Sequence, residues 1–188
     1  AASGDLGAVI VDGDTPDITA IAATDGDYSI GEVISITVTF DQAVDVTSSP
    51  TLTLSNSDTA TYSSGTGSTD IVFTTTVASG DTASSDLSVS SINANGGNIE
   101  DAGDNDFSTT IADGDLGSVT VDVTVPTMTI TSSTASSGAS TNTQAFALTF
   151  TSSEATSDFI ADDITATGCT LSSLSATSTT VYTATCSV

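Results

Sequence analysis

Acidic side chains gather at two places in the sequence where they could bind a cation. One group lies in the segment VDGDTPD and the other in EDAGDND. Ca²⁺ takes six to eight oxygen ligands, several of them carboxylates, from flexible loops that often contain glycine. The sequence therefore predicts Ca²⁺ as a cofactor, although Asp-Gly pairs also form ordinary turns without a metal, and both interpretations remain open. The candidate ligands are Asp12, Asp14, Asp17, Asp101, Asp104 and Asp106. A third acidic group, Asp25, Asp27 and Glu32, flanks a further turn.

The second chemical feature is the absence of any basic side chain. The 188 residues include 24 Asp and Glu but no Lys, Arg or His, which gives a net charge of −24. Without an imidazole or an amine, the chain lacks the usual general bases and activated nucleophiles. Asp162 and Asp163 are adjacent in a predicted strand and would face opposite sides of it, so they do not form a carboxylate pair. We expect no enzyme activity, and the charge disfavours nucleic acid and anionic lipid as partners.

Cys169 and Cys186 are the only two cysteines of the chain. They lie on two predicted strands joined by a turn around 175–179. If Leu174 pairs with Val181, Cys169 lies opposite Cys186, within reach of a disulfide. The alternatives are two free thiols or two thiolates that bind a metal ion. A disulfide would indicate an oxidising compartment outside the cytoplasm.

Hydrophobic residues alternate with polar ones along short segments. Ile34, Ile36, Val38 and Phe40 share one face of such a segment, and Phe146, Leu148 and Phe150 share a face of another. This period of two predicts β-strands with one buried side. Similar patterns occur at 51–54, 70–77 and 86–92 and at two segments between 162 and 186, separated by Asp-Gly and Ser-Gly turns. We expect about seven strands per 110 residues and no helix.

An internal repeat sets the predicted domain boundaries. Residues 4–12 read GDLGAVIVD and residues 114–122 read GDLGSVTVD, followed at the same spacing by Pro16 and Pro126. A period near 110 residues matches one β-sandwich domain. The sequence therefore predicts a final strand of a preceding or neighbouring module at 1–12, a complete sandwich at 13–122 and an apparently incomplete one at 123–188.

Long parts of the chain resemble bacterial Ig-like repeats of large secreted or cell-surface adhesin and fibre proteins. The resemblance rests on TPDITAIAATDGDYSIGEVISITVTFDQAVDV with GGNIEDAGDND, and on TSSEATSDFIADDITATGCTLSSLSATSTTVYTATCSV. It implies an all-β fold of tandem Ig-like antiparallel β-sandwiches, often with calcium at the junctions. The cysteine pair departs from the usual pattern of these repeats.

These observations together predict a non-catalytic structural module of an extracellular filament or cell-surface adhesin. Its partners would be neighbouring copies or modules of the same protein. The sequence contains no run of 18 apolar residues, so we expect no membrane insertion. If the 188 residues are a whole subunit, strand 4–12 of one copy could complete the C-terminal module of the next; part of a longer chain is the other interpretation. The alternative function is a carbohydrate- or host-binding surface module, including one on a phage or virus appendage, with a glycan or surface ligand.

Overall fold

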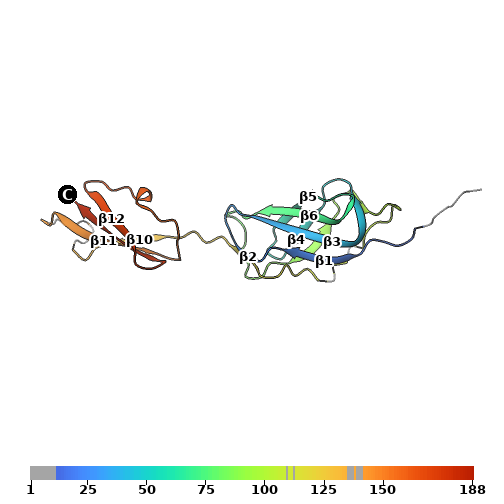
Figure 1. Ribbon diagram of the computed structural model, residues 1–188, viewed down its shortest axis with the longest axis horizontal. Helices are drawn as coiled ribbons and strands as arrows, with labels where there is room; N and C mark the ends of the chain where they lie inside the picture. The colour runs from blue at the N-terminus through green and yellow to red at the C-terminus, as the bar shows by residue number, and fades with distance from the viewer. Residues whose placement is uncertain (1–11, 109, 112, 135–137, 139–141) are drawn as a thin grey trace, which may run out of the picture. The chain divides into compact units, whose positions relative to one another are not determined.

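The computed structural model describes residues 12–108, 110–111, 113–134, 138 and 142–188 (Figure 1). The predicted strand at 1–12 lies outside the described residues except for Asp12. The chain divides into two compact units, Ala1–Thr124 and Val125–Val188, hereafter unit 1 and unit 2. The prediction from the repeat placed the division between residues 122 and 123.

Unit 1 is built from nine strands in its described part, more than the seven that the sequence predicts. Six of them form one continuous sheet in the order β1-β3-β6-β5-β4-β7, and β8 pairs with one end of β3. The alternating segments supply β3, β4, β6 and β7 of this sheet, while β2 and β8 are short strands in turn-rich segments without such a pattern. The strands are β1 (Ile18–Ala23), β2 (Gly26–Ser29), β3 (Val33–Val46), β4 (Thr51–Leu54), β5 (Thr59–Ser64), β6 (Ser68–Thr76), β7 (Val89–Asn93), β8 (Ile99–Glu100) and β9 (Val119–Asp122).

The sheet of unit 1 encloses a single hydrophobic core. Ile34, Ile36, Val38 and Phe40 of β3 are all buried, as their alternation predicts, and Phe73 of β6 lies fully buried beside them. Strands β4 and β7 contribute to the same cluster, and Figure 1 shows β4 behind β3. The two ends of the sheet therefore face each other across one apolar interior, as in a sandwich.

Strands β2 and β9 form a separate parallel pair beside the antiparallel sheet of unit 1. Gly26 pairs with Val119 and Ser29 with Asp122. The pair forms because residues 114–122, the second copy of the repeat, run back along unit 1 and bury Leu116, Val119 and Val121. This segment of the repeat thus supplies part of the core of unit 1.

Gly114 at the start of this segment lies close against β7. Val89 N–H donates a hydrogen bond to Gly114 O at 2.7 Å. A Cβ atom added at Gly114 would lie only 2.0 Å from the carbonyl oxygen of Val89. We expect Gly114→Ala to destabilise unit 1 by about 1–3 kcal/mol, since the backbone contact must open. The control is Gly80→Ala, where nothing lies within 4 Å. Urea denaturation of both variants tests this, and equal stability would contradict the contact.

The described part of unit 2 contains one antiparallel sheet of four strands in the order β10-β11-β13-β12. In chain order, the first two strands pair, and the fourth lies between the second and the third. Strands β1, β3, β5 and β6 of unit 1 are arranged in the same way, so the two sheets share this part of their topology. The elements are β10 (Met128–Thr131), β11 (Ala145–Ser152), the 3-10 turn η1 (Ala161–Asp163), β12 (Thr170–Ala176) and β13 (Val181–Ser187).

The 3-10 turn corrects one prediction. Asp162 and Asp163 lie in η1 and not on a strand. Asp163 accepts a hydrogen bond from the backbone N–H of Ile160 at 2.9 Å, which stabilises the turn in place of a strand ladder. The segment 153–169 therefore crosses unit 2 as a loop.

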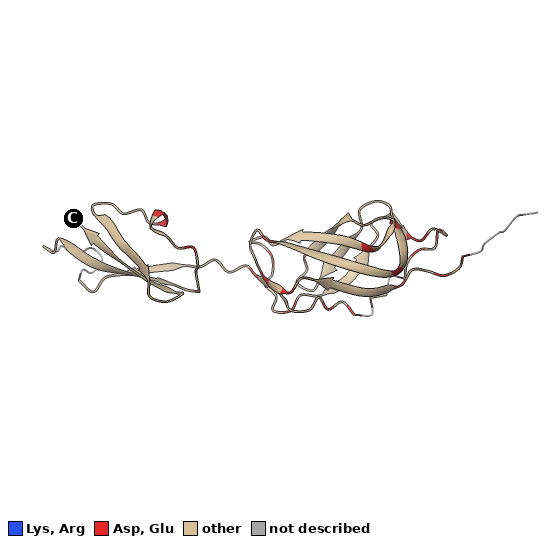
Figure 2. Cartoon of the chain, viewed as in Figure 1, with Lys and Arg blue, Asp and Glu red and all other residues tan. Residues whose placement is uncertain are grey.

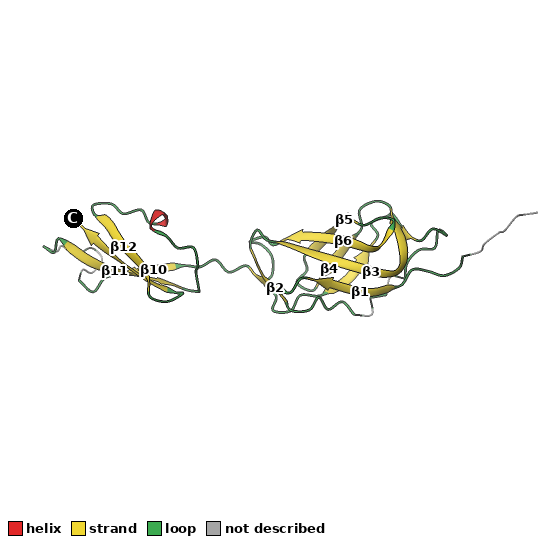
Figure 3. Ribbon diagram, in the orientation of Figure 1, coloured by secondary structure: helices red, strands yellow, loops and turns green. Residues whose placement is uncertain are grey.

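The fold class predicted from the alternation is confirmed. Figure 3 shows strands and loops throughout the described chain with one short helical turn. No helix among the described residues is long and apolar enough to cross a membrane.

Candidate functional site

The acidic residues lie mostly in loops and at strand ends, as Figure 2 shows. Many of them accept hydrogen bonds from nearby backbone N–H groups. Glu32 binds Ser29 N at 2.7 Å, Asp81 binds Ala78 N at 2.7 Å and Asp122 binds Thr124 N at 2.8 Å. Because the chain has no cationic side chain, backbone N–H groups, hydroxyls and side-chain amides are the protein donors that remain for the carboxylates.

The two predicted calcium segments come together around Asp101. Its carboxylate is buried and accepts from Gly103 N at 2.7 Å, from Asn105 N at 3.0 Å and from the Asn105 side chain. Gln42 on β3 donates both to the Asp101 carboxylate and to the carbonyl of Asp14, each at 3.3 Å. Asn105 also reaches the carbonyl of Asp12 at 3.5 Å. Segments separated by about 90 residues in sequence are thus joined by amide side chains.

The N–H groups around Asp101 are typical of a loop held by hydrogen bonds rather than of a calcium-binding site. Both oxygens of Asp101 already accept from N–H groups, and Asp104 and Asp106 are exposed at the loop surface. Asp17 lies apart from them, with its backbone N–H bound to Asp41. Within the described ranges, no three acidic or cysteine side chains lie close enough to hold a metal. Calcium binding by these residues stays a prediction.

The hydrogen bonds around Asp101 predict a pH dependence. Asn105, through its backbone and then its side chain, holds the pKa of Asp101 below its ordinary value of 3.8, against the opposing effect of desolvation. A carboxyl with a lowered pKa in the folded state stabilises the fold above pH 3.8, and this contribution is lost as the pH falls through the folded pKa.

We therefore expect Asp101→Asn to destabilise unit 1 at neutral pH and to differ less from the wild type as the pH falls below about 4. Urea denaturation at several pH values measures the difference. Asp86→Asn removes one charge from an exposed position and serves as the control. A wild-type advantage over Asp101→Asn that is unchanged down to pH 2 would contradict the role of the ionised carboxylate.

The third acidic group stabilises the β2–β9 pair. Asp25 accepts from Ser118 N at 2.9 Å, and Asp27 accepts a short hydrogen bond from the Thr120 hydroxyl. Glu32 caps the turn after β2. Each of these three carboxylates accepts a hydrogen bond from a different donor and stabilises the backbone near it.

The predicted disulfide is present in unit 2, but the predicted strand register is wrong. Cys169 and Cys186 are bonded with Cα atoms 5.6 Å apart. Cys186 lies opposite Leu171, and Cys169 precedes β12. The pairing is already offset beside the turn, where Ala176 lies opposite Tyr182, and a bulge at Ser172–Ser175, with Ser173 at a φ of 59°, shifts the register again. The disulfide therefore joins the end of loop 153–169 to the central strand β13.

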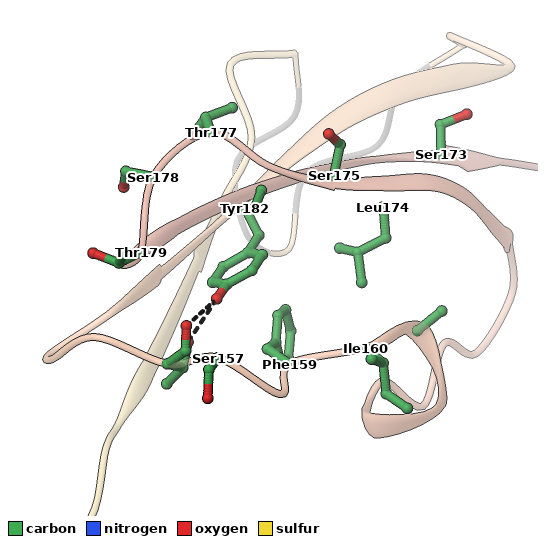
Figure 4. Close-up of a pocket in the computed structure, with 13 residues that line it drawn as sticks. Ser157, Phe159, Ile160, Ser173, Leu174, Ser175, Thr177, Ser178, Thr179 and Tyr182 are labelled. Atoms are coloured by element: carbon green, nitrogen blue, oxygen red, sulfur yellow. Dashed lines mark hydrogen bonds between the residues drawn. The ribbon is translucent and has the colours of Figure 1, made fainter.

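A shallow hollow of about 830 Å³ lies between that loop and strand β12. Phe159 packs on Phe150 and Tyr182, with ring centroids 5.6 and 4.9 Å apart. The Tyr182 hydroxyl holds the loop through hydrogen bonds to the backbone and side chain of Thr156 (Figure 4). Leu174 of β12 faces Phe159 across the hollow in the same view.

Sequence analysis did not identify this hollow. Phe159 lies in a segment rich in Ser and Asp without any alternation, so no periodic signal marks it as a core residue. Gln42 was missed for a similar reason, since a single amide on a predicted strand gives no indication of its distant partners.

The strand arrangement of unit 2, with an aromatic core beneath one sheet, places it in the class of Ig-like β domains. Residues 122–187 match the family model described as a bacterial Ig-like domain. No curated protein and no solved structure matches the chain significantly. Domains of this family are generally non-catalytic and often occur on cell-surface or secreted proteins.

Proposed function

We propose that this chain is a non-catalytic structural module of an extracellular filament or cell-surface adhesin, and that copies assemble head to tail by strand complementation. The observation that carries the proposal is a hollow on unit 2 that no acidic side chain lines, within a chain of net charge −24. Acidic surfaces repel one another, so an uncharged surface is the natural place for copies to meet. The paired strands of both units would carry tension along the chain.

Strand complementation is supported by the repeat. Residues 114–122 supply buried side chains to unit 1, and residues 4–12 have nearly the same sequence. A second copy could offer its residues 4–12 to a unit that lacks such a segment. Added strands bind through main-chain hydrogen bonds and alternate side chains.

Deletion of residues 1–12 tests the proposal. The purified full chain should form filaments in electron micrographs as its concentration rises, and high salt should promote them by screening repulsion. The deleted chain should stay monomeric in sedimentation experiments. A full chain that stays monomeric at every concentration and salt level would overturn assembly, and filaments that survive the deletion would overturn strand complementation.

The alternative of a glycan-binding surface has less support. Sugar sites usually present aromatic side chains together with free polar groups. The hydroxyls of Tyr28, Tyr62 and Tyr182 are each hydrogen-bonded within their own unit. No observation on the described chain favours a glycan over a second copy.

A further inference from the structure

The apolar side of the unit 2 sheet is covered less completely than its counterpart in unit 1. Val38 and Ile36 of β3 are fully buried, whereas Leu148 and Phe146, 110 residues further along, are only partly buried. Phe150, Tyr182 and Ala184 form the buried centre of unit 2. Strand residues pack around this centre, and among the described residues outside the sheet, loop 153–169 adds Phe159 and Ile164. The core of unit 2 is therefore open to an additional apolar group.

The hollow beside β12 is the place where such a group can enter. Its floor is formed by Phe159 and Leu174, which approach from opposite sides, and Tyr182 closes one end (Figure 4). β12 is the last strand of its sheet, and no strand of the described chain pairs with its outer edge. The bulge at Ser172–Ser175 forms one wall. An extended segment could thus lie along the end of β12 and insert a side chain into the hollow.

The charge of the hollow suits a partner from the same acidic protein. None of the 13 residues that line it is acidic, although the chain carries a net charge of −24. Residues 6–11, LGAVIV, are likewise uncharged. Side chains of residues 6–11 can therefore enter the hollow without placing a carboxylate inside it.

We infer that the hollow of unit 2 binds residues 4–12 of a second copy, with Leu6 inserted between Phe159 and Leu174. The inference rests on the proposed function and names its acceptor site. Ile10 has a side chain of equal size but corresponds in the repeat to the partly buried Thr120, so Leu6 is the anchor. Its counterpart in the repeat, Leu116, is 2% exposed in the core of unit 1. Val9 and Val11 correspond to the buried Val119 and Val121.

A cross-linking experiment on the unaltered full chain locates the site directly. A synthetic peptide of residues 4–12, with a photoreactive diazirine leucine in place of Leu6, is added in excess to the dilute chain and irradiated. Mass spectrometry of peptic fragments should find the cross-links at 156–161 and 173–182. Cross-links that map elsewhere, or that a scrambled peptide forms equally well, would overturn the site.

A matched pair of variants tests the anchor. Leu174 and Leu171 are both partly buried residues of β12 in the same cluster, but only Leu174 lines the hollow. Leu174→Ala should weaken peptide binding at least tenfold and Leu171→Ala less than threefold, measured by fluorescence anisotropy of labelled peptide. Equal weakening would overturn the assigned anchor. Should Leu174→Ala fail to fold, the cross-links in the unaltered chain decide the question.

The two proposals fail in different ways. Cross-links in the hollow of a full chain that never forms filaments would support the site and overturn head-to-tail assembly. Filaments that depend on residues 1–12, together with cross-links outside the hollow, would support the proposed function and overturn the assigned site.

Discussion

Removal of the Cys169–Cys186 disulfide is expected to destabilise unit 2 by about 3 kcal/mol. The bond closes a loop over a sequence separation of 17 residues, and loop-closure entropy for that length gives this magnitude. A unit of about 64 residues has a total stability on the order of 3–10 kcal/mol, and the buried centre of unit 2 is small. Loss of the bond therefore removes a large part of what holds the unit folded.

Replacing both cysteines, Cys169→Ala with Cys186→Ala, provides the measurement without leaving a free thiol. With a urea slope near 1 kcal/mol/M, the midpoint of unit 2 should fall by about 3 M. Hydrogen–deuterium exchange on peptic fragments follows the two units separately: β13 should lose protection at lower urea, and β6 should not. An unchanged midpoint for β13 would show that packing alone stabilises unit 2.

The sequence predicts the strands of this protein better than it predicts how they pair. Alternation along β3 places Ile34, Ile36, Val38 and Phe40 inside, because a strand with one buried face requires it. Pairing depends on features that alternation does not encode. The bulge after Leu171 moves the register of β12 against β13, and the parallel β2–β9 pair joins residues more than 90 positions apart.

The sequence predicts the disulfide better than it predicts the role of the aspartates, and the reason is again physical. A disulfide needs two cysteines within reach of each other, and with only two in the chain the partner was fixed before the register was known. Aspartates are harder to interpret because a carboxylate can bind a cation or accept backbone hydrogen bonds, and the same loop spacing serves both. Asp101 shows this ambiguity: its donors include Gln42, 59 residues away, which no local motif indicates.

Ile36→Ala is expected to destabilise unit 1 by about 2–5 kcal/mol, because Ile36 is fully buried at the centre of β3 and its truncation leaves a cavity. Ile30 is the same residue type in the same unit but is 40% exposed, so Ile30→Ala should cost less than about 1 kcal/mol. Urea denaturation followed by hydrogen exchange of β3 and β6 compares the two variants. Similar losses for both would mean that the two-residue alternation does not identify the residues that stabilise unit 1. A large loss confined to Ile36→Ala would instead show that the stability of unit 1 depends on the buried face of β3. This strand pairs with β1 on one side and with β6 on the other.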